Sequence, residues 1–256
     1  MADAEAAPKK SDLKVRAASA VVMIAIAGLA IWLGGWFWFT FVGAAALGVL
    51  WEWWGLVRRF SSGLAGRVVW MVGGVAYIGL AASMLALLRD APPTGWLVLM
   101  IVMLAVILTD IGAYFSGRAI GGPKIAPSIS PSKTWAGLGG GILGASLGVA
   151  LAVRFGTSDP FAGWVNAALA KQGIEESYAA VNLWPGITGA LVWGLPIAVV
   201  AQAGDFFESW MKRRAGVKDS GKLIPGHGGL FDRVDGLLAV MFGFGLLSLQ
   251  AYLAAL

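Results

Sequence analysis

DFFESWMKRRAGVKDSGKLIPGHGGLFDRVDG, residues 205–236, concentrates charge between two of the most apolar segments of the chain. It holds five of the 14 acidic residues, six of the 19 lysines and arginines, and the only histidine, His227. Charge at the edge of a membrane-type helix is energetically costly. The stretch therefore indicates a functional site between the last two membrane helices.

The composition is that of a membrane protein. Of the 256 residues, 58% are hydrophobic and 13% are charged, whereas soluble domains have roughly 45–50% apolar and about 25% charged residues. The apolar residues fall in long runs, so we expect an all-α polytopic membrane protein. Because the chain has no cysteine, disulfides, thiolate metal sites and cysteine nucleophiles are excluded.

Seven apolar runs are each about 20 residues long, enough for a helix to cross the hydrocarbon core. The first run could also be a secretory signal peptide, but its length favours an uncleaved membrane anchor. Residues 1–14 are predicted to be a disordered cytoplasmic tail, and residues 15–256 a single integral-membrane domain. If residues 156–183 enter the membrane, the number of spans rises to eight or nine. The seven predicted spans are residues 17–35, 36–57, 68–88, 96–115, 136–155, 184–211 and 237–256.

The distribution of basic residues predicts the topology. With the N-terminus in the cytoplasm, the tail and loops 58–67, 116–135 and 212–236 lie inside and hold sixteen of the 19 lysines and arginines. The remaining three, Arg89, Arg154 and Lys171, lie outside. This split follows the positive-inside rule. The basic charge is therefore topological, and no nucleic-acid partner is expected.

The end of the sixth predicted span carries a polar stripe. Asp205, Glu208, Ser209 and Lys212 recur at helical spacing and share one face of a helix. Two carboxylates on such a stripe can share a hard cation such as Mg²⁺. The alternative is that Asp205 and Glu208 only pair with nearby basic residues at the membrane interface.

A glycine turn follows, and then two more carboxylates. Gly226 to Gly229 surround His227, and Asp232 and Asp235 are spaced three residues apart at the mouth of the last span. Glycines let backbone N–H groups approach an anion closely. Taken alone, the cluster is typical of an ordinary turn, and His227 of a structural histidine. The combination with two carboxylate pairs favours a site.

The predicted loop 116–135 offers a second group of polar residues. Asp110 lies within the preceding apolar run, and Arg118 and Lys124 follow it. Ser130, Lys133 and Thr134 supply hydroxyls and an ammonium suited to phosphate oxygens. The alternative is a helix N-cap before the fifth span. The topology places this loop on the same side as residues 212–236, so we expect one shared site.

Two features stay open at this level. Glu52, among tryptophans in WEWWGL, is expected to snorkel to the membrane edge, with a site role secondary. The fifth span is rich in small residues, from Gly137 to Gly144, which permits close helix packing. That packing is either within the chain or the seam of a homodimer.

Several motifs together resemble a known family. Residues 209–213 (SWMKR), 218–219 (KD), 225–229 (PGHGG) and 232–235 (DRVD) match the signature of bacterial phosphatidate cytidylyltransferase, also called CDP-diacylglycerol synthase. Asp110, Tyr114, Arg118 and residues 130–135 (SPSKTW) are similar to the same family. The resemblance covers roughly residues 105–245. Ser132 and Ala136 depart from it, where family members commonly have lysine and glutamate.

The resemblance implies transfer of the cytidylyl group of CTP to phosphatidic acid, with Mg²⁺, at the cytoplasmic face of the bacterial inner membrane. The sequence leaves open a second cation beside Mg²⁺. The resemblance also implies metal binding by Asp205 and Asp232, with Glu208 and Asp235 as additional ligands. Phosphate groups would be held by Ser130, Lys133, Thr134, Lys212, Lys218 and Arg233. His227 and Asp219 would shape the loop or hold the nucleotide, and further substrate contacts would come from Asp110, Arg118, Ser209, Gly228 and Gly229.

Three other functions fit parts of the pattern. A CTP-dependent kinase of a polyprenol or phytol-type lipid would transfer the γ-phosphate of CTP rather than its α-phosphate. A cation-coupled transporter would use its intramembrane carboxylates as an ion path, although these acids gather at one membrane face. A non-catalytic lipid-binding scaffold would show neither turnover nor flux.

Overall fold

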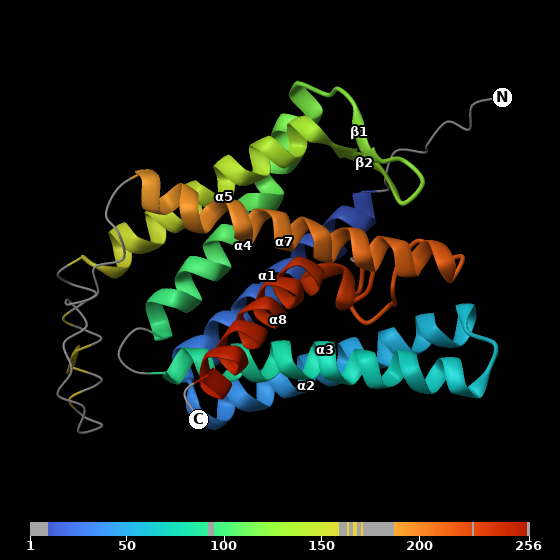
Figure 1. Ribbon diagram of the computed structural model, residues 1–256, viewed down its shortest axis with the longest axis horizontal. Coiled ribbons are helices and arrows are strands. Elements are labelled where there is room, and N and C mark those ends of the chain that lie inside the picture. Colours follow the sequence, from blue (N-terminus) through green and yellow to red (C-terminus); the bar gives the residue numbers. More distant parts are fainter. Residues whose placement is uncertain are drawn as a thin grey trace.

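The computed structural model describes residues 10–91, 95–158, 187–226 and 228–254, together with residues 163, 166, 167 and 170. Within these residues the chain forms seven helices and a two-stranded antiparallel hairpin (Figure 1). The elements are α1 Lys10–Leu33, α2 Gly35–Phe60, α3 Leu64–Asp90, α4 Gly95–Ala119, β1 Lys124–Ala126, β2 Ser130–Thr134, α5 Trp135–Gly156, α7 Ile187–Arg214 and α8 Phe231–Ala254.

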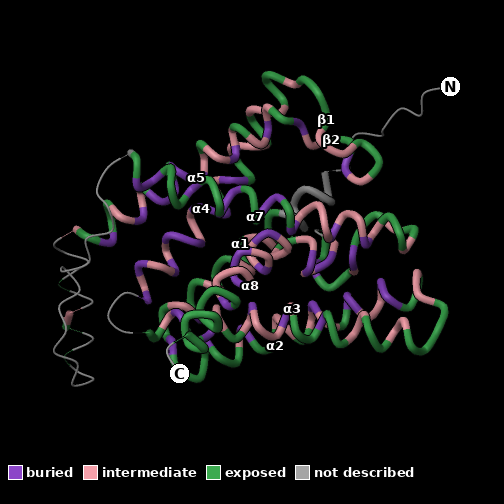
Figure 2. The backbone as a smooth tube through the Cα atoms, viewed as in Figure 1, coloured by how far each residue is buried: buried purple, intermediate pink, exposed green. Residues whose placement is uncertain are grey.

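Six of the described helices, α2 to α5, α7 and α8, are long and apolar enough to cross a membrane. This confirms the predicted all-α polytopic class, with helix bounds within a few residues of most predicted spans. The apolar part of α1, Ala17–Leu33, is shorter than the other six. Apolar residues such as Trp36 and Leu64 are exposed, and Figure 2 shows that exposed residues recur along the helices. In a membrane, exposed apolar faces contact lipid.

Two predicted segments fall largely outside the described residues. Residues 1–9 of the predicted tail are not described, whereas α1 already begins at Lys10. Most of residues 156–183, the candidate for one or two additional spans, also lies outside the described part of the chain.

The helix packing brings the predicted site segments to one end of the molecule. α5 packs along α4, α7 packs against both α5 and α8, and α8 packs against α3. The hairpin between α4 and α5, the end of α7 and the start of α8 all lie in the right-hand half of Figure 1. The loops 116–135 and 212–236 therefore come together, as the topology predicted.

The seam between α4 and α5 is closed by glycines. A Cβ atom at Gly144 would collide with the carbonyl oxygen of Leu108, and one at Gly112 with the carbonyl oxygen of Gly140. The small residues of α5 thus serve close packing within the chain, where backbones approach directly. A homodimer stays a prediction.

We expect Gly144→Ala to destabilise the protein by about 1–3 kcal/mol, because the new methyl group overpacks the α4–α5 seam. Gly139→Ala is the matched control, since nothing lies within 4 Å of its Cβ position. That control should be neutral or stabilising by up to about 1 kcal/mol, because alanine favours the helix. Reversible unfolding in mixed detergent micelles measures both. Equal effects of the two substitutions would contradict the close packing.

Residues 124–134 form a hairpin where the sequence predicted only a loop. Lys124 pairs with Thr134, and Ala126 with Ser130. Thr134 then caps α5, because its hydroxyl oxygen accepts a 3.0 Å hydrogen bond from the backbone N–H of Gly137. Thr134 is therefore a helix N-cap, as the alternative interpretation of this motif predicted. Lys133, one residue earlier, pairs instead with Asp205 on α7.

Candidate active site

One half-buried lysine joins two helices at the centre of the site. The Lys212 ammonium on α7 lies 2.5 Å from Glu208 Oε2 and 2.6 Å from Asp232 Oδ1 on α8. The Glu208 side chain is only 1% exposed, and those of Asp232 and Lys212 are 9% and 15% exposed. Ion pairs shielded from water are far less screened than surface pairs. Lys212 therefore lies between two carboxylates and reduces the repulsion between them.

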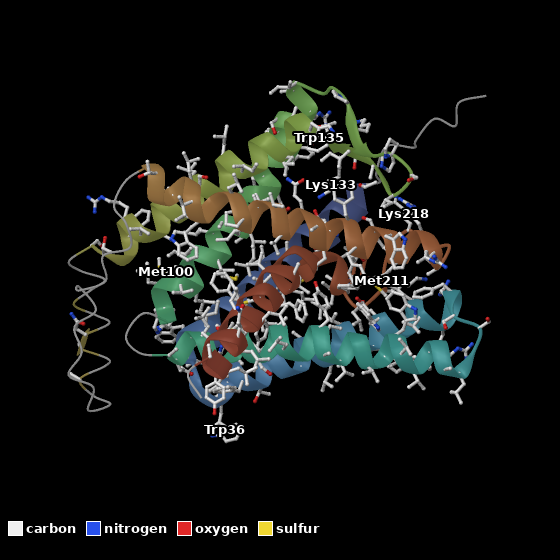
Figure 3. The ribbon with its side chains drawn as sticks, in the orientation of Figure 1. Trp36, Met100, Lys133, Trp135, Met211 and Lys218 are labelled. Carbon is white, nitrogen blue, oxygen red and sulfur yellow. The ribbon has the colours of Figure 1, made fainter. Side chains whose placement is uncertain are left out.

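A second cluster lies one helical turn along α7. Lys133, from β2, forms an ion pair with Asp205 and lies between the hairpin and α7 in Figure 3. The side chain of Asp235 lies close to that of Asp205. Asp110 on α4 interacts electrostatically with both Asp205 and Lys133. Residues predicted from four separate motifs thus meet at one place.

The hairpin is tied to α7 by more than Lys133. The Arg213 Nε–H group donates a 3.3 Å hydrogen bond to the carbonyl oxygen of Ile129, in the turn of the hairpin. The Lys133 ammonium also lies 5.9 Å from the ring centre of Phe206, a distance typical of a cation–π contact. These contacts hold the hairpin against the charged end of α7.

The loop between α7 and α8 folds around Asp232. Its Oδ2 atom accepts hydrogen bonds from the N–H of Ser220 (3.0 Å), the hydroxyl of Ser220 (2.9 Å) and the N–H of Gly229 (2.9 Å). The glycine turn was predicted to bring backbone N–H groups to an anion. In this structure the N–H of Gly229 meets a carboxylate of the protein itself.

Glu52 is buried, so the expectation that it snorkels to the membrane edge is wrong. Its side chain belongs to a residue only 3% exposed. It accepts hydrogen bonds from the N–H groups of Leu230 (3.0 Å) and Phe231 (2.8 Å) and from the hydroxyl of Ser220 (3.1 Å). The sequence alone showed only a carboxylate within an apolar run. Its partners could not be predicted, because they lie 168 to 179 residues further along the chain.

Other predicted residues lie around the two clusters without joining them. Arg118 is exposed and donates to the Tyr114 hydroxyl at 2.9 Å. Lys218, Asp219 and Arg233 are exposed, and Lys218 lies at the same end of the molecule in Figure 3. Gly228 borders Asp219, whose Cγ lies 3.4 Å from a Cβ built on that glycine. Ser130 is buried in β2 and Ser209 half-buried on α7, while His227 lies outside the described residues.

The donor set suits a hard cation. Asp205, Glu208 and Asp232 pair with two lysines, and Asp235 lies beside Asp205, so the four carboxylates and two ammonium groups have a formal balance of −2. Glu208 Oε1 is buried without a hydrogen-bond partner among the described residues. No three acidic or histidine side chains in that part of the chain are already gathered as a metal cage. A metal site at the four predicted carboxylates therefore stays a prediction.

The chain is similar in sequence to known cytidylyltransferases. The model of the cytidylyltransferase family matches residues 63–249. The chain is 38% identical to the phosphatidate cytidylyltransferase of Brucella suis over 184 residues, 72% of this chain and 57% of that protein. It is 32% identical to the phosphatidate cytidylyltransferase of Rickettsia bellii over 234 residues, 90% of this chain and 88% of that protein.

The fold and the site define a polytopic α-helical membrane protein with a charged, lysine-bridged carboxylate cluster at one end of its helices. The chain belongs to the cytidylyltransferase family. It spans a little over half the length of the Brucella relative.

Proposed function

We propose that the protein transfers the cytidylyl group of CTP to phosphatidic acid, giving CDP-diacylglycerol and pyrophosphate for phospholipid synthesis. The observation that carries the proposal is the pair of lysine-bridged carboxylate clusters, where α7, α8 and the hairpin meet at one end of apolar helices. The names of the relatives support the same reaction. Such a site lets a lipid headgroup and a nucleotide react at the membrane edge.

In the proposed reaction a phosphate oxygen of phosphatidic acid attacks the α-phosphorus of CTP. The bond from that phosphorus to the bridging oxygen of the β-phosphate breaks, and pyrophosphate leaves with the electron pair. The attacking group is already an anion at neutral pH, so no strong general base is needed. The main obstacle is the repulsion between two polyanions, which cationic groups at the site reduce.

The residues of the two clusters have complementary tasks in this proposal. Lys133 and Lys212 exchange their carboxylate partners for substrate phosphates, assisted by Ser130, Thr134, Lys218 and Arg233 at the edge of the site. Asp205 and Asp232, with Glu208 and Asp235, would hold Mg²⁺. When bound, the ion would supply neutralisation of phosphate charge. Asp219 and His227 are proposed to shape the loop or contact the nucleotide, and Asp110, Arg118, Ser209, Gly228 and Gly229 to border the substrates.

We also propose that the site faces the cytoplasm of the bacterial inner membrane. The loops at the site end carry most of the basic residues, and cytoplasmic loops have this excess. CTP would reach the site from water, while phosphatidic acid would approach from the inner leaflet.

Labelled CTP tests the function. Purified protein in detergent, given phosphatidic acid and Mg²⁺, should incorporate label from the α-phosphate of CTP into lipid and release the γ-label as pyrophosphate. Excess EDTA should stop incorporation, and added Mg²⁺ should restore it. Incorporation of the γ-label would show a lipid kinase instead. Ion flux in liposomes without CTP turnover would show a transporter, and neither activity a scaffold.

A further inference from the structure

Glu52 on α2 reaches into the loop that carries the acidic residues of the site. We propose that Glu52 is a positioning residue, an internal anion around which Ser220, Gly221 and residues 229–231 fold so that Asp232 is held in place for CTP. This proposal rests on the proposed function because it concerns the same site. It adds a residue that lies before the segment matched by the family model, which begins at residue 63.

Glu52 supplies acceptors at the start of α8. The first N–H groups of a helix have no partner within the helix, and here those of Leu230 and Phe231 donate to Oε1 and Oε2 of Glu52. A negative charge at this position is also favoured by the helix dipole. The start of α8, with Asp232 one residue later, is therefore fixed by a side chain from another helix.

Ser220 connects Glu52 to Asp232 directly. Its hydroxyl lies 3.1 Å from Glu52 Oε2 and 2.9 Å from Asp232 Oδ2. A serine hydroxyl has one proton and can donate to only one acceptor at a time. The two carboxylates therefore compete for it, and a change at one alters the hydrogen bonding of the other.

The loop is shaped to admit the Glu52 carboxylate. A Cβ at Gly221 would collide with that carboxylate, and a Cβ at Gly229 would lie 2.7 Å from Glu52 Oε2. Trp53, the next residue of α2, is 2% exposed and packs on Phe231 with ring centres 5.8 Å apart. Two consecutive residues of α2 thus hold the same residue of α8, one by its backbone and one by its ring.

Glu52→Gln has a predictable effect on this arrangement. A glutamine has one acceptor oxygen and one NH₂ donor in place of two acceptor oxygens. In either orientation, its NH₂ group faces the backbone N–H of Leu230 or of Phe231. The start of α8 then loses an acceptor, and Asp232 is no longer held at its present position.

The experiment uses the full chain in detergent with four variants: Glu52→Gln, Ser220→Ala, their combination, and Ser146→Ala. The last is the control, because Ser146 is a buried residue on α5 whose hydroxyl donates a hydrogen bond to the carbonyl oxygen of Ile142 in the same helix. The dissociation constant of labelled CTP is measured by equilibrium dialysis with Mg²⁺. Hydrogen–deuterium exchange of the amides of residues 229–231 is measured without any ligand.

Glu52→Gln should weaken CTP binding about tenfold and Ser220→Ala about threefold, as expected for lost hydrogen bonds to charged groups. The combination should be weaker by about tenfold only, because both changes break one network. Amide exchange at 229–231 should be faster in Glu52→Gln and unchanged in Ser146→Ala. If Glu52→Gln does not fold, Ser220→Ala decides by the same two measurements.

Fewer binding sites with an unchanged dissociation constant would show a purely structural role and overturn the proposal. A dissociation constant within about twofold of wild type and unchanged exchange would also overturn it. If the wild-type protein binds CTP but makes no lipid product, the proposed function fails while this proposal is judged on CTP binding. If the wild type does not bind CTP, both proposals fail, whatever the exchange data show.

Discussion

Asp232→Asn is expected to lower the rate of CDP-diacylglycerol formation at least about a thousandfold, equivalent to a loss of roughly 4 kcal/mol of charge stabilisation. Asp232 accepts three hydrogen bonds at Oδ2 and the Lys212 ammonium at Oδ1. An asparagine must turn its NH₂ group either toward that ammonium or toward the loop donors. Turnover of labelled CTP in detergent measures the loss.

Asp90→Asn is the matched control, because Asp90 pairs with Arg89 near the end of α3, outside the two clusters. It should retain wild-type turnover. Asp205→Asn should lose activity as fully as Asp232→Asn, because both are proposed to hold Mg²⁺. All three proteins should be compared by their melting temperatures. Near-normal turnover in either Asp205→Asn or Asp232→Asn, with the protein folded, would remove that residue from the metal assignment.

Lys212→Met is expected to cost about 3–5 kcal/mol of unfolding free energy, because it leaves buried carboxylates without their cation. The side chains of Glu208 and Asp232 are 1% and 9% exposed, so water screens them little. Methionine keeps most of the volume of lysine without its charge. The loss is measured by unfolding in mixed micelles, together with CTP turnover, which should also disappear.

Two further variants separate charge from packing. Lys212→Met combined with Glu208→Gln should recover part of the lost stability, because one buried charge is removed, yet it should stay inactive. Lys222→Met changes an exposed lysine of the same loop and should alter stability by less than about 0.5 kcal/mol. A loss below about 1 kcal/mol for Lys212→Met alone would mean that the two carboxylates do not depend on this lysine.

The sequence predicted the membrane helices because each requires about 20 consecutive apolar residues, a signal contained within the segment itself. The helix ends were less well placed. α8 begins at Phe231 rather than at 237, since Glu52 and Asp232 supply acceptors to backbone groups at its start. The hairpin at 124–134 was missed because its strands are short and mostly polar, without the alternation that marks a half-buried strand.

The part of the candidate site that could be predicted is the part formed by residues close together in the sequence. The helical spacing of Asp205, Glu208 and Lys212 is local, and the Lys212–Glu208 pair follows from it directly. The partnership of Lys133 with Asp205 joins residues 72 positions apart, so the sequence gives only their common side of the membrane. The burial of Glu52 depends on a loop that packs against α2 from the far end of the chain, and no local pattern carries that information.

Trp51 and Glu52 are neighbours on α2, yet the first is 69% exposed and the second 3% exposed. Trp51 faces outward, where exchange for another large apolar residue preserves contact with acyl chains. At Glu52 even the isosteric amide disturbs a loop from the other end of the protein. Tolerance to substitution should therefore change abruptly between neighbouring residues of α2. The average hydropathy of the helix does not show this difference.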